Sequence, residues 1–116
     1  MNILKLNEIY KIDVSFSNIY ILEKNRENLG KKILVNTSTR VFEGVKYDTL
    51  YIIEPRVAYL IPLPKKLQNK FLYIQNLIGE TGIILQPLKN YILLYNTNEN
   101  LIYLNQDIEL CNIKEV

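Results

Sequence analysis

The 116-residue chain contains no histidine, no tryptophan and one cysteine, Cys111. Without an imidazole it lacks the usual general acid or base near neutral pH and the commonest nitrogen ligand for metals. A single cysteine excludes an intrachain disulfide and a cysteine-rich metal site, and it favours a reducing, cytoplasmic setting. We therefore expect no catalytic residue, no bound metal and no cofactor.

The chain also has few glycines and a small net charge. The four glycines are dispersed, so the sequence has no glycine-rich loop that could hold a phosphate. The net charge of +2 is not the clear basic excess of a dedicated nucleic-acid binder. No stretch has the pattern of a signal peptide or a membrane span, so we expect no membrane contact.

Apolar residues and tyrosines are abundant, and in the first half of the chain their pattern indicates strands. The hydrophobic fraction is 48%, which is enough to form a core without disulfides. Loose alternation predicts two short strands within residues 1–23, a third over residues 32–37 and a fourth over residues 50–53. Residues 23–32 are polar and are expected to form a loop.

Two helices are predicted in the middle of the chain. In "EPRVAYLI", Pro55 cannot donate to a strand ladder but fits the first turn of a helix, so residues 54–61 are read as a short helix that Pro62 ends. A second helix is predicted from Pro64 to Ile78. Its apolar positions are Leu67, Phe71, Ile74, Leu77 and Ile78.

Strands are predicted again over residues 82–88, 90–97 and 100–110, with a hairpin turn at residues 96–100 that joins the last two. The element order predicts an α+β fold with a small strand-rich N-terminal lobe, two helices, and a C-terminal β-hairpin and strand. We place the N-terminal lobe at residues 1–62 and a reduced C-terminal α/β lobe at residues 63–116.

Two surfaces are candidates for binding. Lys65, Lys66 and Lys70 form the best basic patch, which could contact an RNA backbone or could be an ordinary solvated surface. The last predicted strand is apolar and could be a sheet edge that recruits a partner. Its candidate interface residues are Leu101, Ile102, Tyr103, Leu104, Ile108 and Leu110.

The segment "LYIIEPRVAYLI" resembles the N-terminal domain of archaeal tRNA-splicing endonuclease subunits, where a strand leads into a helix with an Ala-Tyr-Leu-Leu type sequence. The matching positions are Leu50, Ile52, Ala58, Tyr59, Leu60 and Ile61, with Gly44 upstream. Residues 71–85 and 90–104 resemble, in the same order, a helix ending in glycine before a strand and a closing hairpin. Arg56 departs from the family, which usually has a glutamate there.

This resemblance implies a structural, non-catalytic subunit. Active members have a Tyr-His-Lys triad, and a chain without histidine cannot supply it. The implied role is assembly with a catalytic endonuclease subunit, in a heterotetramer that cleaves introns from precursor tRNA at bulge–helix–bulge sites. The family's C-terminal strand contact maps onto residues 101–110, and Glu80 or Glu99 would stand in for its acidic docking loop.

Two other interpretations stay open. The segment "YILLYNTNENLIYLNQDIEL" resembles the late strands of the trimeric dUTPase-like β fold, where Tyr-Asn precedes a turn and a further strand. That family's Gly-x-Ile-Asp-x-x-Tyr sequence is absent, and Leu85 follows Gly82-Ile83-Ile84 where the aspartate would fall. This resemblance implies a catalytically inactive, all-β protein. The third interpretation is an unrelated small protein–protein interaction module.

Overall fold

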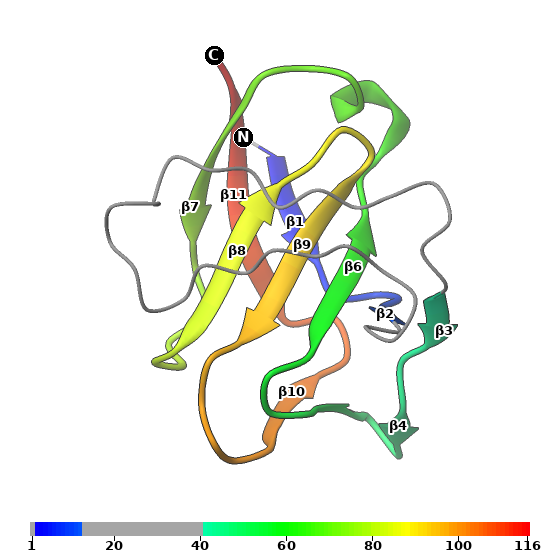
Figure 1. Ribbon diagram of the computed structural model, residues 1–116. Helices are drawn as coiled ribbons and strands as arrows, with labels where there is room; N and C mark the ends of the chain where they lie inside the picture. The colour runs from blue at the N-terminus through cyan, green and yellow to red at the C-terminus, as the bar shows by residue number, and fades with distance from the viewer. Residues whose placement is uncertain (1, 13–40) are drawn as a thin grey trace.

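The computed structural model describes residues 2–12 and 41–116. Within these ranges the chain forms strands and one 3₁₀ turn, at Lys65–Leu67 (Figure 1). The strands are β1 (Asn2–Lys5), β2 (Tyr10–Ile12), β3 (Val41–Glu43), β4 (Lys46–Tyr47), β5 (Leu50–Ile53), β6 (Ala58–Pro62), β7 (Leu72–Asn76), β8 (Ile83–Pro87), β9 (Tyr91–Asn96), β10 (Ile102–Asn105) and β11 (Glu109–Glu115). The predictions for residues 13–40 lie outside the described residues.

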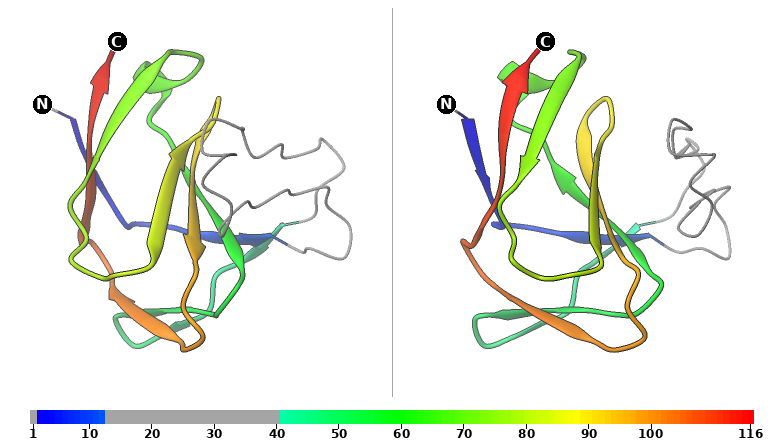
Figure 2. Two further views of the ribbon diagram at one scale, coloured as in Figure 1. Left: turned by 60° about the vertical axis from the view of Figure 1, so that its left-hand side comes forward. Right: turned by 90° about the vertical axis from the view of Figure 1, so that its left-hand side faces the viewer.

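The strands form three antiparallel sheets, so the predicted α+β fold is wrong and the observed fold is all-β. One sheet has the order β1-β11-β7, and a larger one has the order β3-β2-β6-β9-β8. These two sheets face each other, while the small sheet β10-β5-β4 lies across one end (Figures 1 and 2).

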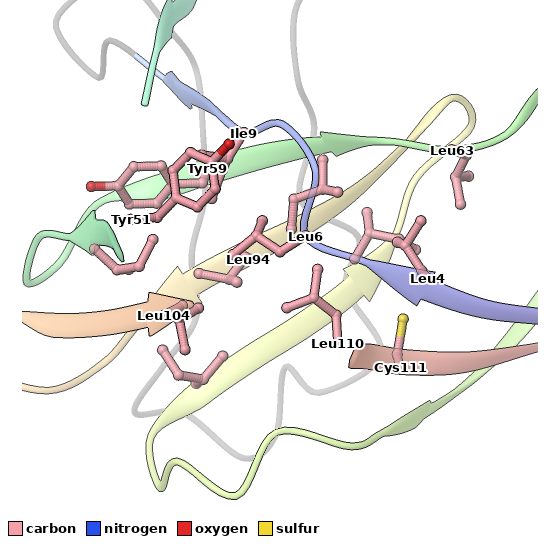
Figure 3. Close-up of a cluster of buried hydrophobic side chains, with 14 of the residues drawn as sticks. Leu4, Leu6, Ile9, Tyr51, Tyr59, Leu63, Leu94, Leu104, Leu110 and Cys111 are labelled. Carbon is pink, nitrogen blue, oxygen red and sulfur yellow. The ribbon is translucent and has the colours of Figure 1, made fainter. Parts of the chain in front are cut away.

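The main core lies between the sheets. It contains Leu4 from β1, Leu94 from β9, Leu104 from β10 and Leu110 with Cys111 from β11, all turned toward one another (Figure 3). A smaller cluster packs on the opposite face of β6 and β9 and includes Leu60 and Leu93. Both faces of these two strands are therefore buried, which requires continuous apolar runs rather than alternation.

The helix predicted at residues 54–61 is wrong, because this segment forms a turn followed by β6. The burial of both faces of β6 explains the error. Tyr59 and Ile61 enter the main core while Ala58 and Leu60 enter the smaller cluster, so the strand has no polar face. A short apolar run of this kind cannot be told from a buried helix by its periodicity. Pro55 lies in the preceding turn, where Arg56 has a φ of 58°.

The helix predicted from Pro64 to Ile78 is also wrong. The chain makes only the 3₁₀ turn, and Asn69 then takes a φ of 60°, which no α-helix tolerates. The strand β7 follows and half-buries Leu72 and Ile74 against the core, a period of two. Phe71, which the helical pattern placed inward, is 83% exposed.

The C-terminal segment also differs from the prediction. The hairpin is β8–β9, because β10 pairs with β5 and not with β9. The single strand predicted over residues 100–110 is two strands, separated by a turn in which Asp107 has a φ of 65°. Pairs β1–β11 and β6–β9 join segments on opposite sides of the lobe boundary predicted after residue 62.

Candidate functional site

The outer surface of the sheet β10-β5-β4 presents aromatic and aliphatic side chains to solvent. Tyr103 pairs with Ile52, and the Ile52 amide donates to the Val45 carbonyl at 2.9 Å, which makes one cross-strand row. Tyr47 pairs with Leu50, which begins a second row that ends at Asn105. We call these five apolar residues, together with Leu101, the β10–β5–β4 face.

Alternation along the strands creates this face. Ile102 and Leu104 of β10 point into the core, as do Tyr51 and Ile53 of β5, so the intervening residues must point outward. Tyr47 is 76% exposed and Tyr103 is 55% exposed. Ile52 and Leu50 are half-buried between them, so the face is continuous across three strands.

The structure divides the predicted interface residues into two groups. Leu101 and Tyr103 are exposed on the β10–β5–β4 face. The side chains of Ile102, Leu104 and Leu110 are buried in the main core, and Ile108 is half-buried against it. The strand β10 is an edge, as the sequence indicated, since it pairs only with β5 among the described strands.

Both predicted acidic contacts lie on neighbouring loops. Glu80 is exposed in the loop between β7 and β8, and Glu99 is exposed in the turn between β9 and β10. The two loops are joined because the Asn98 side-chain amide donates to the Thr81 carbonyl at 2.7 Å. Within the described ranges, no group of three or more acidic or thiol side chains is close enough to hold a metal ion.

The predicted basic patch is present but is not on a helix. Lys65 and Lys66 are exposed in the 3₁₀ turn, and Lys70 follows it. Lys70 is paired with Glu115, with 2.8 Å between its Nζ and a carboxylate oxygen, so part of its charge is neutralised. Lys65 and Lys66 have no ion pair among the described residues.

Sequence reasoning missed Val45, Tyr47, Leu50 and Ile52 as members of the exposed face. Residues 50–53 were correctly predicted as a strand, and alternation would have shown that Leu50 and Ile52 share one side. The sequence did not show which strand pairs with β5. That partner is β10, which follows about fifty residues later in the chain.

The two buried groups with the largest pKa shifts, Cys111 and Tyr59, are both shifted away from reactivity. Burial raises the pKa of the Cys111 thiol to about 11, so the thiol stays protonated and unreactive. Burial is also the main cause that raises the pKa of Tyr59 to about 12. Its hydroxyl accepts the Glu54 amide at 2.9 Å and fixes the β5–β6 turn.

The dUTPase-like interpretation matched Leu85 with that family's aspartate, and Leu85 lies on β8 in the hairpin β8–β9. Gly82 has a φ of +87° and precedes β8. Leu85 packs against the main core. A leucine cannot take a proton from water, so the hairpin has no catalytic base there.

Comparison with protein-family models, curated proteins and solved structures found no match. In the described residues, no helix is long and apolar enough to span a membrane.

Proposed function

We propose that the chain is a non-catalytic protein that acts by binding a protein partner through the β10–β5–β4 face. The observation that supports this most strongly is the continuous exposed row of Val45, Ile52 and Tyr103 beside Tyr47 and Leu50. Tyrosines are enriched in interface centres because a rigid ring buries a large area at a low entropic cost. Isolated exposed apolar residues would need no such explanation.

Two further features favour binding over catalysis. Throughout the described residues, the buried thiol and tyrosine have raised pKa values, which is opposite to what a nucleophile needs. The free edge of β10 also adjoins the face, so a partner could combine side-chain contacts with backbone hydrogen bonds to this strand.

Site-specific photo-crosslinking tests the proposal. A photoreactive phenylalanine analogue replaces Tyr103 or Tyr47 in the full chain, expressed in its native host. We expect both positions to crosslink the same protein, identified by mass spectrometry. The same analogue at Tyr73, which is 66% exposed on β7, is the matched control and should not capture that protein.

A competing substitution completes the test. Ile52→Lys introduces a charge at the centre of the face and should abolish the adduct formed from position 103 or 47. Tyr73→Lys should leave it unchanged. The proposal fails if the face captures no protein, or if position 73 captures the same protein with equal yield.

A second candidate function rests on the hairpin at Gly82. The all-β fold class, the hairpin and the turn after Tyr95-Asn96 support a dUTPase-like protein that has lost its activity. We expect no release of pyrophosphate from dUTP with Mg²⁺, because Leu85 replaces the aspartate. Sedimentation equilibrium should then find a trimer. Hydrolysis of dUTP, or a strictly monomeric chain, would contradict this candidate.

The role of structural subunit in a tRNA-splicing endonuclease stays a prediction that no comparison tests. Its strongest match placed Ala58 to Ile61 on a helix, and these residues form β6. The crosslinking experiment bears on it directly, since the captured protein would then be a catalytic endonuclease subunit.

A further inference from the structure

A pocket of about 360 Å³ lies on the five-stranded sheet, apart from the β10–β5–β4 face. Its volume is near the lower end of small-molecule sites, roughly 300–1,000 Å³. Two tyrosines, two primary amides, a proline and a leucine line it, and none of these side chains is charged. The lining residues are Tyr10, Leu60, Pro62, Gln68, Asn90 and Tyr91.

The strand register places the aromatic part of the pocket. Tyr10 pairs with Leu60 across β2–β6, and Pro62 pairs with Tyr91 across β6–β9. Because Leu60 and Pro62 are two residues apart on β6, all four side chains share one face of the sheet. The two phenols therefore stand over an apolar floor that Leu60 and Pro62 form.

The two primary amides of the pocket, Gln68 and Asn90, lie near the end of β6 and the start of β9, where hydrogen bonds to Leu63 hold their segments. The Leu63 amide donates to the Asn90 carbonyl at 3.0 Å, and the Gln68 Nε2 donates to the Leu63 carbonyl at 2.9 Å. The Oε1 of Gln68 and the side-chain amide of Asn90 have no hydrogen-bond partner among the described residues. Each primary amide offers both a donor and an acceptor to a ligand.

This combination of groups suits a flat heteroaromatic ring with donors and acceptors along its edge. Aromatic side chains stack on bases of any sequence, and asparagine or glutamine pairs with base edges. A purely apolar ligand would leave both amides unsatisfied, and a charged one would find no opposite charge in the lining. The base of a nucleotide satisfies both requirements.

Two lysines close to the lining residues in the chain match the phosphate of such a ligand. Residues 60–70 and 86–92 supply most of the lining, and within them Lys89 precedes Asn90 and Lys65 lies three residues before Gln68. Lys66 lines a different pocket, and Lys70 is paired with Glu115. The Asn69 amide donates to the Lys89 carbonyl at 2.9 Å and holds the two segments together. Two acids lie near Tyr10, because its hydroxyl donates to a Glu8 carboxylate oxygen at 2.7 Å and Tyr10 pairs with Glu43 across β2–β3.

We propose that this pocket binds the base of a nucleotide between Tyr10 and Tyr91, with Asn90 and Gln68 on its edge and with Lys65 and Lys89, which flank the lining residues, toward its phosphate. Two sources supply this chemistry, namely free nucleotides and single-stranded nucleic acid. The proposal stands on the pocket residues alone and is independent of the proposed partner function.

The test is fluorescence anisotropy of the full chain with labelled eight-nucleotide rA and rU oligomers, and competition by unlabelled AMP and UMP. Displacement by a mononucleotide at millimolar concentration would identify free nucleotides as a sufficient ligand. Binding of oligomers without such displacement would identify single-stranded nucleic acid. No binding of oligomers or mononucleotides would overturn the proposal.

Matched variants locate the site. Tyr91→Ala should weaken binding about tenfold, since stacking on one ring is worth roughly that much, whereas Tyr91→Phe should retain it. Tyr73→Ala removes a tyrosine outside the pocket that is more exposed than Tyr91, 66% against 37%, and should change nothing. Lys89→Glu should weaken binding and flatten its salt dependence. Equal loss in the Tyr91→Ala and Tyr73→Ala variants would overturn the assignment to this pocket.

Discussion

Gly82 and Asn98 are so close that no side chain fits between them. A Cβ added to Gly82 would lie 2.6 Å from the Asn98 Nδ2, and the glycine has a φ of +87°. The Gly82 carbonyl also accepts both the Thr97 amide at 2.9 Å and the Thr97 hydroxyl at 2.7 Å. The start of the β8–β9 hairpin is therefore locked to the turn that leads into β10.

Substitution of Gly82 by alanine should destabilise the fold. The positive φ and the contact with Asn98 together should lower the free energy of unfolding by about 2 kcal/mol. Gly79→Ala is the matched control, because nothing lies within 4 Å of an added Cβ there. Urea denaturation followed by circular dichroism measures both, and equal stabilities would refute the prediction.

Replacement by leucine should destabilise the fold much more at the buried Asn96 than at the buried Asn112. The Asn96 side chain donates to the Ile53 carbonyl at 3.2 Å and the Asn100 carbonyl at 3.1 Å, so Asn96→Leu should cost about 2–3 kcal/mol. The Oδ1 of Asn112 is buried without a partner, so Asn112→Leu should change stability by less than about 1 kcal/mol. Urea midpoints compare the two, and a larger loss at Asn112 would contradict this assignment.

Alkaline pH should destabilise the fold partly through Tyr59. Its pKa is about 12 in the folded protein and about 10 when exposed, so the unfolded chain loses the proton first. The stabilising contribution is complete below pH 10 and is lost as the pH rises from 10 to 12. Tyr59→Phe should lose less stability over that interval than the parent chain. Parallel declines measured by denaturation at each pH would exclude Tyr59 as the cause.

Cys111 should react with thiol reagents only after unfolding. The side chain is fully buried, and burial raises its pKa to about 11, so both access and thiolate are lacking at pH 8. We expect negligible labelling by a disulfide reagent in buffer and complete labelling in 8 M urea. Rapid reaction of the folded protein would show that the core around β11 opens readily.

The sequence predicted those elements whose chemistry is local. Residues 50–53 form β5 as expected, and residues 82–88 and 90–97 closely enclose β8 and β9. Their β-branched and aromatic composition and the turn residues between them are sufficient. The hairpin turn expected at residues 96–100 is wrong, because the turn there joins β9 and β10, which belong to different sheets.

The failures come from long-range context. The run from Ala58 to Ile61 is apolar on both sides because each face of β6 packs in a different core cluster, a fact that no local pattern contains. The segment from Leu67 to Ile78 fits a helical period by coincidence, and the φ of Asn69 ends any helix. For the binding surfaces, the separate residues were visible but their meeting across β10, β5 and β4 was not.

The pairing of β1 with β11 has a consequence for the order in which the fold assembles. Leu4 lies opposite Cys111, more than one hundred residues later in the sequence. Closing so long a loop is slow, because its entropic cost precedes any stabilising contact. We therefore expect β1 to pair late in folding, after local hairpins such as β8–β9 have formed, and its apolar side chains to stay exposed until then.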